Sequence, residues 1–249
     1  SMWPCRLTLM TYNLWNDCEW DRREPAAAAF FGHNQPDILG VQELRGVTRD
    51  FLDAALPDHR RVDDPLPGWT CEGNLWWHGE RFDLVDHGAE PVGHLEPHRR
   101  LFWVRLQPRW AGARELLVAN THFTWVGNPI EANGGISPRF AQAQATVTAL
   151  DRLRRDGQPA VLMGDLNDFA NPIAVLRAGG YVPAGEPIGR PQKVTWPAMF
   201  VLNDAPQAID WVLTKGPIRA LTHEVLDFRL DGVPPSDHMP VQVVFELGE

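Results

Sequence analysis

Two short runs carry residue types that can bind a metal and move protons: Gly164-Asp165-Leu166-Asn167 and Ser236-Asp237-His238. Each run adjoins an apolar segment that predicts a buried strand, residues 160–163 before the first and 239–245 after the second. Carboxylate and amide oxygens suit hard cations such as Mg²⁺, and an imidazole can transfer protons. The two runs therefore predict a metal site for phosphate chemistry, and so a hydrolase.

The same arrangement, a polar residue at the end of an apolar strand, occurs at four further positions: Asn13, Glu43, His122 and Asp210. Three of them also have a structural explanation, as a turn residue, a helix-terminal acid and a hydrogen-bonded strand-end imidazole. Asp210 resists such an explanation, because a buried carboxylate needs a partner. In layered α/β proteins strand ends converge on one rim, so we expect all six segments to build one site.

Three of these residues are candidate metal ligands. Glu43 and Asp237 are the carboxylates expected to bind Mg²⁺, and Asn13 is expected to add a neutral oxygen donor. The remaining coordination positions would be filled by water, which Mg²⁺ gives up reluctantly.

The other residues suit the handling of water and phosphate. Asp165 is expected to orient or deprotonate the attacking water. Asn167 and His122 can donate hydrogen bonds to the phosphoryl oxygens. His238 needs an anionic partner to fix its tautomer and raise its pKa, and Asp210 is expected to supply it.

The elements that must position these side chains alternate along the chain. Strands are predicted at residues 6–12, 38–41, 160–163, 209–213, 220–228 and 241–245, with an antiparallel meander over residues 60–119. Helices are predicted at residues 22–33, 47–56 and 139–155, with a short one ending at Gly179-Gly180. Long loops at residues 60–100, 126–138 and 183–208 are expected to set the substrate.

Composition favours one folded domain over residues 1–249. Hydrophobic residues make up 44% of the 249, which is enough for a sizeable core, and neither a linker nor a repeat is evident. The net charge is −9, and the sequence contains no Lys/Arg block of the kind that binds duplex nucleic acid. A bound cation could supply positive charge locally, so a nucleic-acid substrate is not excluded.

Cysteine usage favours a cytoplasmic protein, and a monomer is expected. Cys5, Cys18 and Cys71 are an odd number without metal-like spacing, so reduced thiols are expected, with one disulfide as the alternative. No segment has the length of a transmembrane span or the pattern of a signal peptide. Secretion is the alternative if a signal peptide preceded Ser1.

Residues next to the motifs are candidates for substrate contacts. Trp15, Trp125 and Trp196 lie in predicted loops and could wall a pocket, stacking on a base, sugar or acyl chain, although most Trp residues are core residues. Arg139, at the start of a helix, is a candidate phosphate contact or a solvated helix end. The pair Arg99-Arg100 is expected in an exposed turn, with a role in substrate binding as the alternative. Seven His residues have no motif beside them and are expected at the surface: His33, His59, His78, His87, His94, His98 and His223.

Taken in order, six motifs resemble those of the endonuclease/exonuclease/phosphatase superfamily, the DNase-like metal-dependent phosphohydrolases. They are Thr11-Tyr12-Asn13, Val41-Gln42-Glu43, Thr121-His122-Phe123, Gly164-Asp165-Leu166-Asn167, Ile209-Asp210-Trp211 and Ser236-Asp237-His238. The resemblance implies an α/β fold, a four-layer α/β/β/α sandwich of two packed mixed β-sheets flanked by helices. It also implies Mg²⁺ or Mn²⁺ dependence, and the site roles given above for the matching residues.

The function expected is a divalent-metal-dependent phosphodiesterase in which an activated water attacks phosphorus. The substrate stays open between a nucleotide or single-stranded nucleic acid and a phospholipid-like ester. Two alternatives are a catalytically silent binding module on the same fold and a secreted nuclease or sphingomyelinase, because one fold serves many functions.

Overall fold

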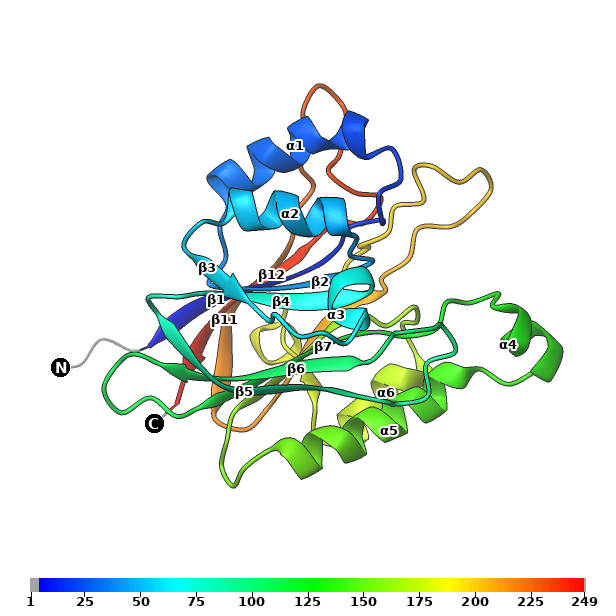
Figure 1. Ribbon diagram of the computed structural model, residues 1–249. Coiled ribbons are helices and arrows are strands. Elements are labelled where there is room, and N and C mark those ends of the chain that lie inside the picture. The colour runs from blue at the N-terminus through cyan, green and yellow to red at the C-terminus, as the bar shows by residue number, and fades with distance from the viewer. Residues whose placement is uncertain (1–4, 249) are drawn as a thin grey trace.

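The computed structural model describes residues 5–248, and residues 1–4 and 249 lie outside the described part. Twelve strands form two six-stranded sheets (Figure 1). The first sheet has the order β11 (Ile218–Val225), β12 (Val241–Leu247), β1 (Arg6–Asn13), β2 (Ile38–Gln42), β4 (Gly73–His78), β3 (His59–Arg61). The second has the order β5 (Phe82–Glu90), β6 (Leu101–Pro108), β7 (Leu116–His122), β8 (Ala160–Asp165), β10 (Asp210–Lys215), β9 (Val182–Pro183).

Helices cover the outer faces of both sheets (Figure 1). α1 (Trp20–His33) and α2 (Gly46–Ala55) lie on the first sheet, and α5 (Pro138–Leu153) and α6 (Asn171–Ala178) lie on the second. The shorter helices are α3 (Gly68–Cys71), α4 (Pro129–Gly134) and the 3₁₀ helix η1 (Glu186–Ile188). The layers therefore run α/β/β/α, with mixed sheets, as expected from the motifs.

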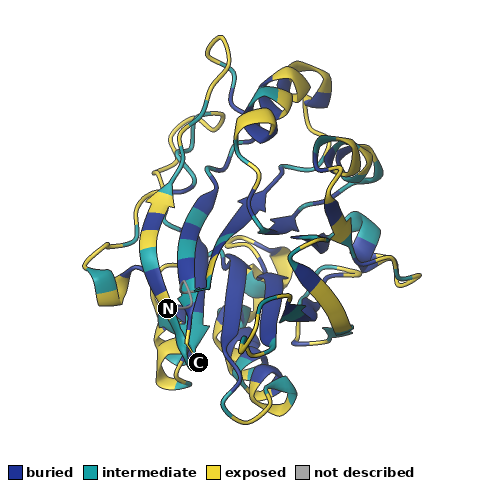
Figure 2. Cartoon of the chain, turned by 90° about the vertical axis from the view of Figure 1, so that its left-hand side faces the viewer, coloured by how far each residue is buried: buried dark blue, intermediate teal, exposed yellow. Residues whose placement is uncertain are grey.

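Three apolar layers hold the sandwich together. β1 shows why, because its alternate side chains face opposite ways: Leu7 and Leu9 join the core between the sheets, and Met10 and Tyr12 join the core under α1 and α2. The third layer lies between the second sheet and α5 and α6. Figure 2 shows the central strands buried and the helices exposed on their outer sides.

Strand directions bring the predicted site residues to one rim. β1 pairs parallel with β2, and β7 pairs parallel with β8, so all four strands end at this rim. β12 runs antiparallel to β1, and β10 runs antiparallel to β8, so both start at the same rim. Asp210 is consequently the register partner of Asp165.

Gly164 permits the close approach of β7 and β8 just before Asp165. Its φ is +150°, and a Cβ at this position would lie 1.8 Å from the carbonyl oxygen of Thr121. Any side chain would therefore push the two strands apart at the point where His122 and Asp165 emerge side by side.

The predicted meander is wrong in one respect. β3 and β4 belong to the first sheet and β5, β6 and β7 to the second, so the chain crosses between sheets after His78. The 126–138 loop contains α4, and the 183–208 loop contains η1. Cys5, Cys18 and Cys71 are free thiols, as expected. Over residues 5–248, the helices all fall short of the length and apolar character that crossing a bilayer requires.

Candidate active site

Glu43 follows β2 and is held by two amide groups. Its Oε1 accepts a hydrogen bond from Nδ2 of Asn13 (3.2 Å), and its Oε2 accepts one from Nδ2 of Asn16 (2.8 Å). These bonds fix the orientation of the carboxylate without neutralising its charge. Asn16 has no recognisable motif around it, and its role emerges only from the structure.

The amide of Asn13 does not have the orientation expected of a metal ligand. Its Oδ1 accepts a hydrogen bond from the backbone N–H of Trp15 (2.9 Å), and its Nδ2 donates to Glu43 and to Oδ2 of Asp165 (2.9 Å). The reverse orientation would set its oxygen against two carboxylates. In this structure the amide of Asn13 positions two acids, and its expected role as an oxygen donor to a cation stays a prediction.

Asp237 and Glu43 form the part of the site that fits a divalent cation. Burial raises the pKa of Asp237, His238 opposes that effect, and the nearby charge of Glu43 raises the pKa further. From the described residues, Asp237 receives only long hydrogen bonds, from Nε1 of Trp196 (3.3 Å) and Oγ of Ser236 (3.4 Å). Two carboxylates that repel each other and keep free lone pairs are a suitable donor set for a hard cation.

Asp165 lies at the end of β8, next to the imidazoles of His122 and His238. Its Oδ2 is 3.3 Å from Nε2 of His122 and 3.7 Å from Nε2 of His238, and its Oδ1 accepts from the backbone N–H of Asn167 (2.9 Å). Burial alone would raise the pKa of Asp165, but the two imidazoles and the hydrogen bonds hold it below its usual range. These neighbours therefore favour the ionised form of the Asp165 carboxylate.

His238 is oriented by Asp210, as the sequence predicts. Its Nδ1 lies 2.8 Å from Oδ2 of Asp210, and that oxygen also accepts a 2.6 Å hydrogen bond from Oγ1 of Thr195. Burial would lower the pKa of His238, but the carboxylate of Asp210 outweighs it and raises the pKa well above its usual value. Thr195, which the sequence alone does not single out, also accepts from the backbone N–H of Asp210 (3.0 Å) and so fixes the acid.

Three ligand atoms of Asp165, Asp210 and His238 lie within 4.8 Å of one another, which is another arrangement that could hold a metal. The hydrogen bond between Oδ2 of Asp210 and Nδ1 of His238 occupies one ligand atom of each residue and leaves Oδ1 of Asp210 and Nε2 of His238 open. The carboxylates of Glu43 and Asp237 are the alternative donor set in the same cleft.

Four residues of the candidate site have a strained backbone conformation. Trp15, Asn16, Glu43 and Asn167 have φ between +50° and +56°, a region that side chains rarely adopt, and all four line one cleft. Such conformations cost about 1–3 kcal/mol each and tend to cluster at functional sites. The side chain of Asn167 meanwhile donates to the carbonyl of Phe123 (2.8 Å), which joins the ends of β7 and β8.

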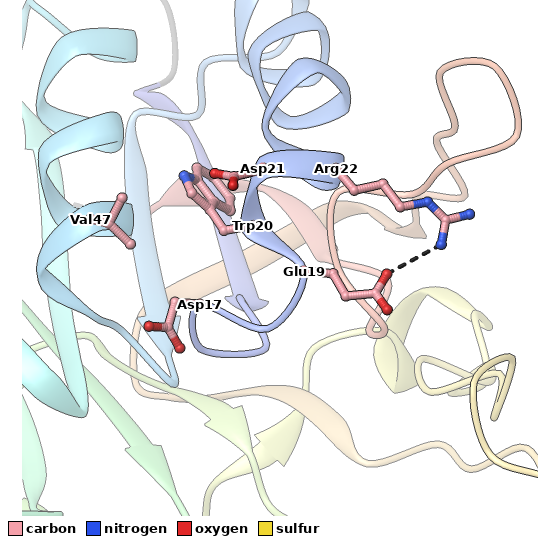
Figure 3. A pocket seen from close by; sticks show the side chains of 6 residues that line it. All are labelled: Asp17, Glu19, Trp20, Asp21, Arg22 and Val47. Carbon is pink, nitrogen blue, oxygen red and sulfur yellow. Dashed lines mark hydrogen bonds and ion pairs between the residues drawn. The ribbon is translucent and has the colours of Figure 1, made fainter.

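The cleft has a volume of about 430 Å³ and contains the catalytic candidates Glu43, His122, Asp165, Asn167, Asp237 and His238. Aromatic side chains form its walls: Trp15 stacks on Phe200 with ring centroids 4.8 Å apart, and Trp125 and Trp196 complete the lining. A larger hollow of about 640 Å³ lies at the start of α1 (Figure 3), but it is a shallow surface feature lined by Asp17, Glu19, Trp20, Asp21, Arg22 and Val47. Chemistry, not size, identifies the active-site cleft.

Two arginines lie in surroundings that differ from those expected from the sequence. Arg139 is buried and donates hydrogen bonds to Glu131, Asp168 and the carbonyl of Thr124, so it braces the loop between β7 and α5 and is not a solvated helix end. Its side chain is not among those that line the cleft, and its contact with phosphate stays a prediction. Arg99 is not in an exposed turn. It is 8% exposed, pairs with Glu72 at 3.0 Å, and lines the cleft.

Residues 10–238 match the Endonuclease/Exonuclease/phosphatase family. The chain belongs to this family. The match covers all six motifs, so the resemblance drawn from the sequence is confirmed. A comparison with curated proteins found no match.

Several solved structures share the family fold. An endonuclease/exonuclease/phosphatase from Bacteroides vulgatus has a TM-score of 0.79 at 17% identity, covering 98% of this chain and 100% of that chain. D. rerio TDP2 complexed with a single strand DNA product has a TM-score of 0.79 at 14% identity, covering 97% and 99%. Bacteroides thetaiotaomicron mannosyl-6-phosphatase Bt3783 has a TM-score of 0.73 at 21% identity, covering 95% and 98%. These similarities confirm the predicted four-layer fold.

Proposed function

We propose that this family member is a phosphodiesterase that depends on Mg²⁺ or Mn²⁺ and directs a water molecule at phosphorus. The observation that carries the proposal is the convergence of Glu43, Asp165, Asp237 and the Asp210–His238 pair in one aromatic-walled cleft. The surplus of acids would repel an anionic phosphate. A divalent cation bound between Glu43 and Asp237 would reverse that repulsion and stabilise charge on the phosphoryl oxygens.

The chain's own residues would divide the remaining work. Asp165, held ionised, would orient the attacking water and accept a hydrogen bond from it. His238, whose pKa is raised by the carboxylate of Asp210, would donate to a phosphoryl or leaving-group oxygen. His122 has its Nδ1 buried without a hydrogen-bond partner within the described chain, and its Nε2 faces Asp165, so it would steady that acid beside the phosphate.

The cleft walls favour a substrate with a planar group next to the phosphate. Trp125 is 49% exposed and offers a face on which a base could stack. Arg99 is the one Lys or Arg among the cleft-lining residues of the described chain, so a long polyanion would find little support. We therefore favour a nucleotide or short single-stranded nucleic acid over a phospholipid-like ester. The TDP2 structure with a single strand DNA product gives a precedent on this fold.

We propose that the enzyme acts as a monomer, which is consistent with a site whose proposed residues all come from one chain. Its three free thiols support a reducing compartment such as the cytoplasm.

A metal-dependent substrate screen tests the proposal. Bis-p-nitrophenyl phosphate and p-nitrophenyl phosphate would be compared with Mg²⁺, with Mn²⁺ and with a chelator. Natural candidates would follow: dinucleotides, single-stranded oligonucleotides, sphingomyelin, inositol phosphates and a sugar phosphate. We expect metal-dependent turnover, with diesters ahead of monoesters and nucleotides ahead of lipids.

The screen also separates the rival functions. Preference for monoesters would favour a phosphomonoesterase, the activity that the name of the mannosyl-6-phosphatase describes. No turnover with any divalent ion, together with retained ligand binding, would contradict the enzyme proposal and favour a catalytically silent binding module.

A further inference from the structure

The side chain of Arg23 makes an unusual set of contacts beside the active site. Arg23 is on the second turn of α1 and is 1% exposed. Its guanidinium donates to five backbone carbonyls: Cys18 (2.7 Å), Leu14 (3.0 Å), Trp15 (3.3 Å), Asn16 (3.3 Å) and Pro235 (2.6 Å). Among residues 5–248 no carboxylate lies within 4.0 Å of it. A buried charge is expensive, so this arrangement calls for an explanation.

The five carbonyls belong to the two segments that flank the proposed metal site. The first is the loop between β1 and α1, which carries Asn16, whose amide holds Glu43. The second ends at Pro235, directly before Ser236 and Asp237. The hydroxyl of Ser236 in turn donates to the carbonyl of Asn13 (2.6 Å), so the two segments are joined again on the active-site side.

A guanidinium suits this position better than any other side chain. Its planar fork presents five N–H donors at fixed angles and stays charged even when buried. Its faces lie against the rings of Trp15 and Trp20, at 5.0 Å and 5.4 Å from the ring centroids. A lysine ammonium has three donors and no flat faces, so it could not hold both segments at once.

We propose that Arg23 is a positioning residue that sets the distance between Glu43 and Asp237, and thereby the affinity of the site for a divalent cation. Its charge near Asp237 also offsets part of the repulsion between the acids before a cation arrives. The inference rests on the proposed metal site. The competing explanation is that Arg23 only fastens α1 to the body of the protein.

Isothermal titration with Mn²⁺ separates these two explanations. Arg23→Lys would be compared with Arg22→Lys, a control on the same helix whose side chain points to solvent and pairs with Glu19 (Figure 3). Changes behind the ligands of metal sites typically cost about 10–100-fold in affinity, so we expect the Kd of Arg23→Lys for Mn²⁺ to rise by at least about tenfold. Arg22→Lys should match the wild type.

The outcomes are distinct. If Arg23→Lys is less stable but binds Mn²⁺ with wild-type affinity, Arg23 only fastens the helix and the inference is overturned. If the wild type binds no Mn²⁺, the proposed function fails first. As a further check on the role of Arg23, excess Mn²⁺ should restore part of the lost turnover of Arg23→Lys, because the site is weakened and not destroyed.

Hydrogen exchange on the wild type decides the matter if Arg23→Lys does not fold. Amides of residues 14–18 and 236–238 should become protected over the same range of Mn²⁺ concentration, because one guanidinium ties both segments. Protection of one segment without the other would overturn the inference.

Discussion

Nδ2 of Asn13, at the end of β1, donates a 2.9 Å hydrogen bond to Oδ2 of Asp165, at the end of β8. The two residues are 152 positions apart and belong to different sheets. The same nitrogen also serves Glu43, so one amide links the proposed metal ligand to the residue proposed to orient water. This hydrogen bond therefore fixes the position of one sheet relative to the other at the proposed active site.

Asn13→Asp tests this link. The substitution places a third carboxylate within reach of Glu43 and Asp165, and the repulsion should lower the free energy of unfolding by about 2–3 kcal/mol in a chelator. Mn²⁺ should reduce the loss, because a cation offsets crowded charge. Urea unfolding with and without Mn²⁺ measures both effects.

Asn13→Ala is the matched control, since it removes the same hydrogen bonds without adding charge. It should lose less stability than Asn13→Asp in the chelator and gain less from Mn²⁺. Equal behaviour of the two variants would show that charge repulsion at this position is unimportant.

Glu43→Gln tests the metal site. The amide keeps the shape of the side chain but removes the charge that would bind Mg²⁺ or Mn²⁺. We expect turnover of bis-p-nitrophenyl phosphate to fall by at least about a hundredfold, and the Kd for Mn²⁺ to rise in parallel. Full activity of the wild type after exhaustive chelation would contradict the role given to Glu43.

Asp210→Asn tests the pairing with His238. The substitution removes the charge that raises the pKa of His238 and can favour the wrong tautomer, so kcat should fall by at least about a hundredfold. His238→Ala should lose about as much, because the two residues act as a unit.

Asp204→Asn is the control for this experiment. Asp204 is an exposed acid in the same cleft with no proposed role, and its substitution should change kcat by less than about threefold, in line with a weak exposed charge. A near-normal rate for Asp210→Asn or His238→Ala would remove the pair from the mechanism.

The six motifs could be predicted because the signal is local: an apolar strand followed at once by an acid, amide or imidazole. The roles that were missed depend on contacts distant in sequence. Asn16 meets Glu43 across 27 residues, Thr195 meets Asp210 across 15, and Arg23 meets Pro235 across 212. A local pattern carries no information about such partners.

Burial of polar residues was the other failure of sequence reasoning. The histidines expected at the surface include His59 and His223, which are 7% and 8% exposed. Nε2 of His59 forms a hydrogen bond with the carbonyl of Pro36 at 2.7 Å, and a local sequence pattern does not predict this partner, which is 23 residues away. The burial of Arg139 is hidden from the sequence for the same reason, since its two acidic partners lie 8 and 29 residues away.

Trp125→Ala tests the aromatic wall. The side chain is half exposed, so its removal should leave the fold intact. Stacking on a base contributes about 1–3 kcal/mol, so KM for a nucleotide substrate should rise by about tenfold while kcat changes little. Bis-p-nitrophenyl phosphate and a lipid ester supply the comparison. An equal rise for the lipid would indicate a general apolar contact and weaken the case for nucleotides.

His94 should make the protein sensitive to acid. Burial, reinforced by nearby Arg99, lowers the pKa of His94 well below its usual value, and its Nε2 bonds Oγ1 of Thr121 at 3.0 Å. Below the unfolded-state pKa of about 6.5 the unfolded chain takes up a proton that the folded chain refuses, so stability falls as pH falls. His94→Gln can keep the hydrogen bond but cannot titrate. Between about pH 7.5 and about pH 5.5, in a chelator, urea unfolding should show a wild-type loss larger than that of His94→Gln by about 1 kcal/mol. Parallel pH dependences would mean that His94 takes up its proton equally in both states.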